Sequence, residues 1–294
     1  MGRLKIDVTP SLQRLDLVVK GLVNTKYIGS YASVFKGTGL EFADFRAYTP
    51  SDDASLIDWV ASNRARKLLV KEFVEERNIN VYFLVDVSSK MMLGTIDKLK
   101  CEYVAELVAS FSNTILRAGD FVGVAMFAEN IKKNIVSVNE MNQFHIISDA
   151  LSNLDFYGGG SSIKNALDYA LKNFSESSLV FLVSDFISDE DFSEELKLAA
   201  RKFDLIGVMV RDPIDLELPE GQGQVLIENP STGERMLISP NKYRGIYAQE
   251  VKKEIATFEK SFRNIGADFL FLDTTKSFVK ELVMFFERRK MQWK

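Results

Sequence analysis

Three short segments rich in acidic and hydroxyl side chains are the part of this sequence that could do chemistry. They read D-V-S-S-K at residues 86–90, G-G-G-S-S at residues 158–162 and S-D-F at residues 184–186. Carboxylate and hydroxyl oxygens suit a hard cation such as Mg²⁺, which takes few protein oxygens and keeps several waters. Glycines let the main chain approach such a site closely. The residue types predict a cation site, provided that the fold brings the three segments together.

The elements that must position these segments are predicted by alternating apolar and amphipathic stretches. Continuous apolar runs are typical of strands buried on both faces of a mostly parallel sheet. The runs are Ile79–Val85, Phe121–Phe127, Leu179–Val183, Asp204–Val210 and Asp268–Leu272. Helical patterns alternate with them, at Lys98–Arg117, Met141–Leu154, Ile163–Phe174, Asp191–Arg201, Tyr243–Ile265 and Lys276–Arg289. The alternation predicts an α/β domain over residues 79–290, in which helices flank a doubly wound, mostly parallel sheet.

The three segments are expected at one edge of this sheet. Two of them directly follow apolar runs, and the glycine-rich one directly precedes a helical pattern. Ligands of open α/β sheets bind outside the carboxyl ends of the strands, near the point where strand order reverses. Residues 222–238 interrupt the alternation, because two short runs there flank Asn-Pro-Ser-Thr-Gly, which predicts a β-hairpin insertion.

Residues 1–78 follow a different pattern. Helical spacing runs over Ser11–Leu22, a turn sequence (T-P-S-D-D) occupies residues 49–53, and a strand pattern covers Leu68–Val74. We expect a small N-terminal α+β segment made of a short helix and a few strands. It is too short for an independent domain to be assigned, and docking onto the α/β domain is the alternative.

Composition narrows the function classes. With 37 basic and 41 acidic residues, the net charge is -4, whereas nucleic-acid and anionic-membrane binders normally carry a basic excess. The single cysteine, Cys101, leaves no internal disulfide and no cysteine-cluster zinc site. No apolar run approaches the ~20 residues that span a bilayer, and the N-terminus lacks a signal-peptide pattern. We therefore expect a cytoplasmic protein without a membrane span.

The three segments resemble the metal-ion-dependent adhesion site of von Willebrand factor A domains. That site reads D-x-S-x-S after the first strand, a threonine in a later glycine-rich loop, and an aspartate after a later strand. By position, Asp86 and Ser88 match its first two ligands, Ser161 takes the threonine position with its hydroxyl kept, and Asp185 matches the distal carboxylate. The resemblance implies a domain that binds other proteins and does not catalyse a reaction.

Upstream residues resemble the signature of one bacterial family of von Willebrand A-like proteins. This is the family named domain of unknown function fifty-eight, often encoded beside MoxR-type AAA+ ATPases. The resemblance lies in R-A-Y-T-P-S-D-D, I-D-W and R-A-R, and its signature residues are Arg46, Asp52, Asp53, Asp58, Trp59 and Arg64. It covers roughly residues 35–290 and implies an adaptor or chaperone-like partner of such an ATPase.

Lys90 departs from the adhesion-site pattern, because it stands where the second serine belongs. Its ammonium group could substitute for the cation or block the site, since lysine is a compact charge on a flexible stem. It could also point away and leave a working site for Mg²⁺ or Mn²⁺. We favour the first alternative, which makes the site a degenerate one and metal binding doubtful.

Other functions have less support from the sequence. A metal-dependent phosphohydrolase using Asp86 and Asp185 is the alternative, but Ser88 stands where such enzymes place an acid–base aspartate. No dinucleotide or P-loop fingerprint is present. Acidic residues follow the basic stripe at residues 64–71 at once, so we expect its arginines to pair with Asp52, Asp53 and Asp58.

Three single residues have simpler interpretations. Trp59 is expected to be a packing anchor. Cys101 lies in an amphipathic helix and is expected to have a packing role, and His145 is expected to have a structural or surface role. With one histidine and one cysteine in the chain, neither a histidine metal cluster nor thiol catalysis is supported.

Overall fold

The computed structural model describes residues 2–6, 40–49, 54–75, 78–188, 190–221, 223–228 and 233–292. The chain divides into two compact units: Met1–Lys26 together with Ile79–Lys294, and Tyr27–Asn78. The predicted boundary at residue 78 is also the end of the smaller unit, whereas the first 26 residues belong to the larger unit. The helix predicted at Ser11–Leu22 lies outside the described residues.

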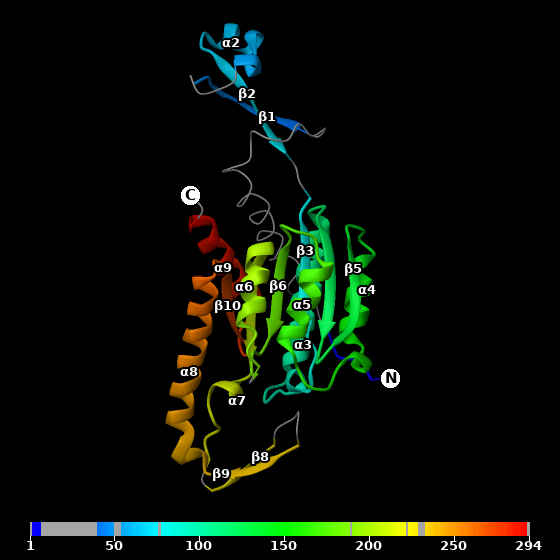
Figure 1. The fold of residues 1–294 in the computed structure, drawn as a ribbon, viewed down its shortest axis with the longest axis vertical. Coiled ribbons are helices and arrows are strands. Elements are labelled where there is room, and N and C mark those ends of the chain that lie inside the picture. The colour runs from blue at the N-terminus through cyan, green and yellow to red at the C-terminus, as the bar shows by residue number, and fades with distance from the viewer. Residues whose placement is uncertain are drawn as a thin grey trace. The chain divides into compact units, whose positions relative to one another are not determined.

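A six-stranded sheet forms the centre of the larger unit, with the order β10-β7-β6-β3-β4-β5 (Figure 1). Its strands are β3 (Asn80–Asp86), β4 (Phe121–Phe127), β5 (Ile131–Val138), β6 (Leu179–Ser184), β7 (Asp204–Arg211) and β10 (Asp268–Asp273). All neighbouring pairs are parallel except β4 and β5. The chain winds from β3 to β5 in one direction and from β6 to β10 in the other, which is the doubly wound order. The predicted fold class is confirmed.

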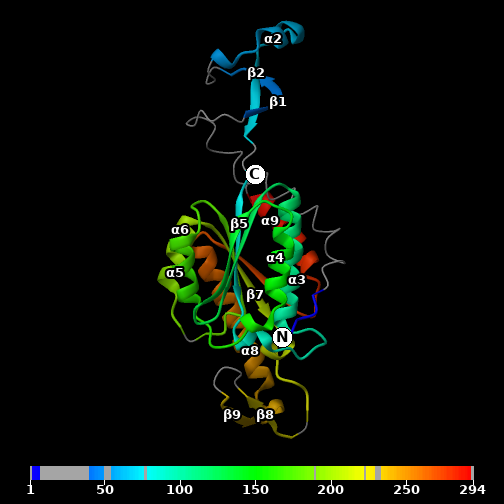
Figure 2. The ribbon, with the colours of Figure 1, turned by 90° about the vertical axis from the view of Figure 1, so that its right-hand side faces the viewer.

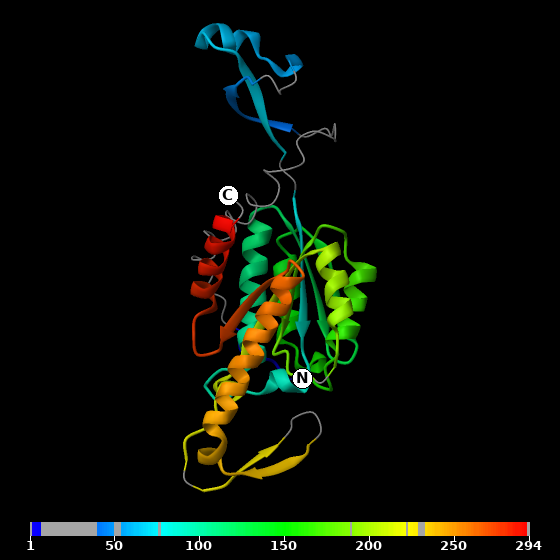
Figure 3. The same cartoon turned by 60° about the vertical axis from the view of Figure 1, so that its left-hand side comes forward.

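Helices cover both faces of this sheet (Figures 2 and 3). One face carries α3 (Lys100–Arg117), α4 (Gln143–Ser152) and α9 (Phe278–Gln292), and the other carries α5 (Ile163–Asn173), α6 (Ser193–Lys202) and α8 (Pro240–Asn264). Because the strands β3, β4, β6 and β7 are buried on both sides, their side chains are apolar in both alternating directions. Across the described ranges, no helix is both long enough and apolar enough to cross a membrane.

Two aromatic-rich cores lie on the opposite faces of the sheet. On the α3 side, the rings of Phe83 and Phe181 stack on neighbouring strands with centroids 5.0 Å apart. On the α8 side, Phe262 lies over Gly207, where a Cβ would come within 2.5 Å of its ring. The ring thus uses the space that glycine leaves on β7.

The smaller unit contains the antiparallel strands β1 (Leu40–Ala47) and β2 (Leu69–Glu75) and the helix α2 (Trp59–Ala65). The predicted strand at Leu68–Val74 is confirmed. Asp58 caps α2 by accepting hydrogen bonds from the backbone N–H groups of Val60 and Ala61 at 3.0 and 2.9 Å. Asp52 and Asp53 lie outside the described residues, so their expected pairing with arginines stays a prediction.

The expectation that Trp59 is a packing anchor is wrong. Its side chain is 68% exposed, and its neighbour Val60 is 65% exposed. Trp59 is the first residue of α2. The buried residue of this helix is Ser62, whose Oγ accepts a hydrogen bond from Leu69 N at 2.8 Å. The position of a tryptophan directly after a helix cap does not show whether its side chain faces the neighbouring strand or solvent.

The predicted hairpin is confirmed as the strands β8 (Val225–Glu228) and β9 (Arg235–Ile238), which follow the short helix α7 (Pro213–Leu216). The short helices η1 (Ala54–Leu56), η2 (Ser89–Met92) and η3 (Leu154–Phe156) complete the assigned elements of the described ranges. The strand β5 was not predicted, because its exposed stretch at residues 132–134 (K-K-N) breaks the apolar run.

Candidate functional site

The site lies where the winding direction of the sheet reverses, between the neighbouring strands β3 and β6. Asp86 is the last residue of β3, Ser184 is the last residue of β6, and Asp185 follows it. Parallel strands present their carboxyl ends at the same edge, so these side chains start close together. Strand order alone therefore explains why Asp86, Ser184 and Asp185 lie at the same edge of the sheet.

Asp86 is the residue on which the three predicted segments meet. Its Oδ1 accepts a hydrogen bond from Ser88 N at 2.9 Å. Its Oδ2 accepts hydrogen bonds from the hydroxyls of Ser161 at 2.8 Å and Ser184 at 2.7 Å. One carboxylate therefore connects the end of β3, the glycine-rich loop and the end of β6.

Burial decides the electrostatics of Asp86. Asp86, Ser88 and Asp185 are all buried. Loss of water raises the pKa of Asp86, and the nearby charge of Asp185 raises it further, while the hydrogen bonds from Ser88 and Ser184 act in the opposite direction. The carboxyl group is thus harder to ionise than an aspartate in water.

The glycine-rich loop closes over this site through main-chain contacts. Gly158 N donates to the carbonyl of Val87 at 2.8 Å, and Ser89 N donates to the carbonyl of Gly159 at 3.0 Å. Gly158 and Gly159 have φ angles of +112° and +87°, a region that favours glycine. At these two positions the backbone angle favours glycine, whereas an added Cβ would meet no described atom closer than 4.0 Å.

Lys100 is the residue that sequence reasoning missed. It is the first residue of α3, its side chain is 1% exposed, and its Nζ donates to Asp185 Oδ2 at 2.9 Å and to Asp215 Oδ2 at 2.8 Å. Burial alone would lower its pKa, but the two carboxylates outweigh burial and raise it. A signal existed: position 100 shares a helical stripe with Val104, Leu107 and Phe111, which favours burial of this lysine.

Lys90 contacts the loop that follows β6. Its ammonium group donates a hydrogen bond to the main-chain carbonyl of Ile187. In the described part of the chain, the lysine that contacts Asp185 is Lys100. The role of Lys90 as a cation substitute or a blocking group stays a prediction, because a motif position does not fix where a long, flexible side chain ends.

A resident divalent cation does not fit the side chains as they are arranged. Both oxygens of Asp185 have donors, since Oδ1 accepts Ile187 N at 3.0 Å and Oδ2 accepts Lys100. The hydroxyls of Ser161 and Ser184 donate to Asp86. Ser88 Oγ is buried and has no hydrogen-bond partner among the described residues, and this one atom falls short of a ligand set. Within the described ranges, no group of three His, Cys, Asp or Glu residues could hold a metal ion.

Charged residues continue from this site toward α8. Asp215 Oδ2 also accepts Asp212 N at 3.0 Å, and Asp212 Oδ2 accepts Thr95 N at 2.9 Å. Tyr247 of α8 donates its hydroxyl to the carbonyl of Asp215 at 3.3 Å. The α7 turn is therefore held by polar contacts with both the loop before α3 and α8.

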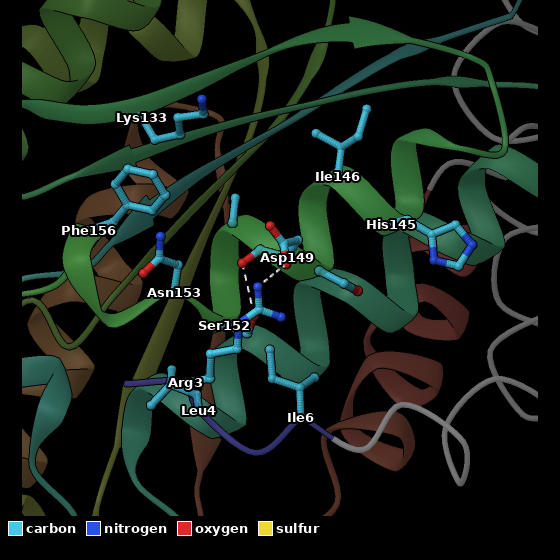
Figure 4. Close-up of a pocket in the computed structure, with 12 residues that line it drawn as sticks. Arg3, Leu4, Ile6, Lys133, His145, Ile146, Asp149, Ser152, Asn153 and Phe156 are labelled. Atoms are coloured by element: carbon cyan, nitrogen blue, oxygen red, sulfur yellow. Dashed lines mark hydrogen bonds and ion pairs between the residues drawn. The ribbon is translucent and has the colours of Figure 1, made fainter. Parts of the chain in front are cut away.

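A hollow of about 810 Å³ lies elsewhere on the larger unit, between the N-terminal residues and α4 (Figure 4). Arg3 and Asp149 form an ion pair across it at 2.9 Å, but both side chains are about two-thirds exposed. His145 lines it and is exposed, in agreement with the surface role that we allowed. None of the predicted site residues lines the hollow.

Strand order and the site at the switch point define an open, doubly wound α/β protein. The family model described as "Protein of unknown function DUF58" matches residues 44–257, and the chain belongs to this family. The uncharacterized protein Rv1480 of Mycobacterium tuberculosis is 23% identical over 285 residues, with 95% of this chain and 89% of that protein covered. YeaD of Bacillus subtilis is 31% identical over 101 residues, with 34% of this chain and 23% of YeaD covered.

Solved structures with a related fold include BatB from Bacteroides thetaiotaomicron. It is 15% identical, has a TM-score of 0.49, and covers 73% of this chain and 100% of its own. A von Willebrand factor type A protein from Catenulispora acidiphila is 13% identical with a TM-score of 0.34, covering 49% of this chain and 35% of its own.

Proposed function

We propose that this chain is a non-enzymatic protein–protein interaction module with a degenerate metal-ion-dependent adhesion site. Its partner is a cytoplasmic MoxR-type AAA+ ATPase, for which it acts as an adaptor or chaperone-like protein. The kind of partner comes from the family resemblance of the upstream signature. Exposed apolar side chains in the loops of the candidate site support a docking surface there.

One observation carries the proposal: apolar side chains are exposed around a buried polar centre. Met92, Ile96 and Ile187 follow the ends of β3 and β6 and are between 36% and 39% exposed. Exposed apolar side chains near polar groups occur at protein-binding surfaces. We call Met92, Ile96 and Ile187 the rim.

The buried centre supports a binding role over a catalytic one. Asp86, the nucleophile of the phosphohydrolase alternative, is 1% exposed, and hydrogen bonds occupy both of its oxygens. A nucleophile must reach the reacting atom. The centre instead holds the loops of the rim in one shape, which reduces the ordering cost when a partner binds.

The test is co-elution with a MoxR-type ATPase from the same organism, with and without ATP, for the wild type and for Met92→Asp/Ile187→Asp. We expect the wild type to bind and the double variant to bind at least about tenfold more weakly, since charges at a docking surface lose apolar contact and pay for desolvation. Val136→Asp is the matched control, because Val136 is 70% exposed on β5, outside the rim. Absence of wild-type binding in both nucleotide states, or turnover in a Mg²⁺-dependent phosphatase screen, would contradict the proposal.

A further inference from the structure

We propose that Lys100 is the resident cation of the switch-point site, so that the site keeps its shape without a divalent metal ion. Its ammonium group stands in for the positive charge that would otherwise hold the acidic strand ends together. The inference deepens the proposed function, but it concerns cation binding by the isolated chain. Its test therefore needs no partner, and either proposal can fail without the other.

The first argument is the geometry of the ammonium group. Lys100 Nζ lies 2.9 Å from Asp185 Oδ2 and 2.8 Å from Asp215 Oδ2, and these residues come from three separate segments. The side chains of Lys100 and Asp185 are 1% and 2% exposed. A buried charge without a partner is very costly, so the lysine and its two carboxylates need one another.

The second argument is that the acidic groups of the site already have donors. Asp185 Oδ1 accepts Ile187 N, and Asp215 Oδ2 accepts Asp212 N in addition to Lys100. Asp86 is satisfied by one backbone N–H group and two hydroxyls. A metal ion on Asp185 would have to displace its donors and to approach a fixed positive charge, which repels it strongly where water is excluded.

The third argument is that the ammonium group is fixed in place. Lys100 opens α3, and the start of this helix is held by Glu102 Oε2, which accepts Leu99 N at 3.0 Å. Lys100 N itself donates to the carbonyl of Leu93 at 3.1 Å. Lys90, by contrast, is partly exposed and reaches only the carbonyl of Ile187. The two lysines therefore make different predictions about metal binding.

The experiment measures Mn²⁺ binding by electron paramagnetic resonance, and the unfolding temperature with Mn²⁺ or EDTA, on the full chain. For the wild type we expect no tight Mn²⁺ site and the same unfolding temperature in both solutions. Lys100→Met removes the charge and keeps most of the volume, so Mn²⁺ should bind about a hundredfold more tightly. Mn²⁺ should also raise the unfolding temperature of this variant.

Two further variants make the result specific. Lys90→Ser restores the hydroxyl of the adhesion-site pattern, and it should leave Mn²⁺ binding within a few-fold of the wild type. Lys100→Met/Asp215→Asn removes the cation and one of its two carboxylates, and it serves if the single variant does not fold. It should bind Mn²⁺ as Lys100→Met does.

The outcomes separate cleanly. Weak wild-type binding, together with tightening in either Lys100 variant but not in Lys90→Ser, supports Lys100 as the resident cation. Tight Mn²⁺ binding by the wild type, or destabilisation of the wild type by EDTA, overturns it. Equal or greater tightening in Lys90→Ser also overturns it, because the charge that excludes the metal would then belong to Lys90.

Discussion

At the scale of single residues, burial decides how much an ion pair matters. The pair of Lys100 and Asp185 spans 2.9 Å between side chains that are almost fully buried. The pair of Lys253 and Glu250 on α8 is shorter, 2.6 Å, but both side chains are more than 60% exposed. Breaking a buried pair from one side costs about 3–5 kcal/mol, whereas an exposed pair contributes about 0–1 kcal/mol. Distance alone would rank the two pairs wrongly.

Asp120 gives a pH prediction at this scale. Its Oδ1 accepts Ile79 N at 2.9 Å, its Oδ2 is buried with no hydrogen-bond partner in the part of the chain that the structure describes, and burial raises its pKa. Between the ordinary pKa of an aspartate and this raised value, the folded state binds more protons than the unfolded state. The free energy of unfolding should therefore fall as pH rises through that window.

Asp120→Asn should remove this contribution, because the amide keeps an oxygen for Ile79 N and does not titrate. The measurement is urea unfolding from about pH 4 to pH 7, with the pH slope of the variant subtracted from that of the wild type. Parallel slopes would show that Asp120 does not contribute.

Sequence patterns located most of the site but not its cation. Asp86, Ser161 and Asp185 converge because each follows a strand or precedes a helix at one edge of the sheet, which motif spacing can reveal. Lys100 lies in no motif, and only its place on the apolar stripe of α3 marks it. The end point of Lys90 depends on the rotamers of a long side chain and on the loop after β6, which no local pattern encodes.

At the scale of elements, one of the contacts between α8 and the sheet joins a glycine and a phenylalanine. A Cβ at Gly207 would meet two ring carbons of Phe262 at 2.5 Å, closer than real Cβ contacts. The strand β7 is buried along most of its length, so neither partner can move away easily. The distance between this strand and α8 is thus set by the missing side chain.

Gly207→Ala should lower the free energy of unfolding by about 1–3 kcal/mol, as expected for overpacking. Gly245→Ala is the control on the same pair of elements, because Gly245 lies in α8 with no atom within 4 Å of an added Cβ. This change should stabilise the chain by up to about 1 kcal/mol, since alanine favours helices. Chemical unfolding measures both, and equal effects of the two substitutions would rule out the packing argument.

Elements were predicted well where burial leaves a regular pattern. The five apolar runs became strands because both faces of the sheet are covered. The edge strand β5 was not predicted, because an edge strand needs apolar residues at few positions. On α2, Trp59 was misjudged since a helix of seven residues has too few turns to define an apolar face.

At the scale of the whole molecule, exposed apolar side chains are spread over many elements. The hairpin is one of them, with Leu226 and Leu237 paired across β8 and β9 and both more than half exposed. An isolated two-stranded hairpin is only marginally stable in water. Its apolar side chains therefore contribute little to the stability of the unit that carries it.

Leu226→Ser/Leu237→Ser should change the free energy of unfolding by no more than about 0.5 kcal/mol, as is usual for surface positions. The same double change at Leu205 and Leu182, buried on β7 and β6, should destabilise by several kcal/mol. Urea unfolding of both variants tests this. A large loss for the hairpin variant would place these leucines in a packed interface.

Cys101 is next to Lys100, and its position has a practical consequence. The thiol is 1% exposed, and burial raises its pKa to about 12. Thiol reagents attack the thiolate, so in the closed molecule this sulfur is protected twice, by lack of access and by lack of charge. Any alkylation of this chain, which has one cysteine, must follow an opening at the start of α3. The rate at which Cys101 is alkylated therefore reports how often the start of α3 opens.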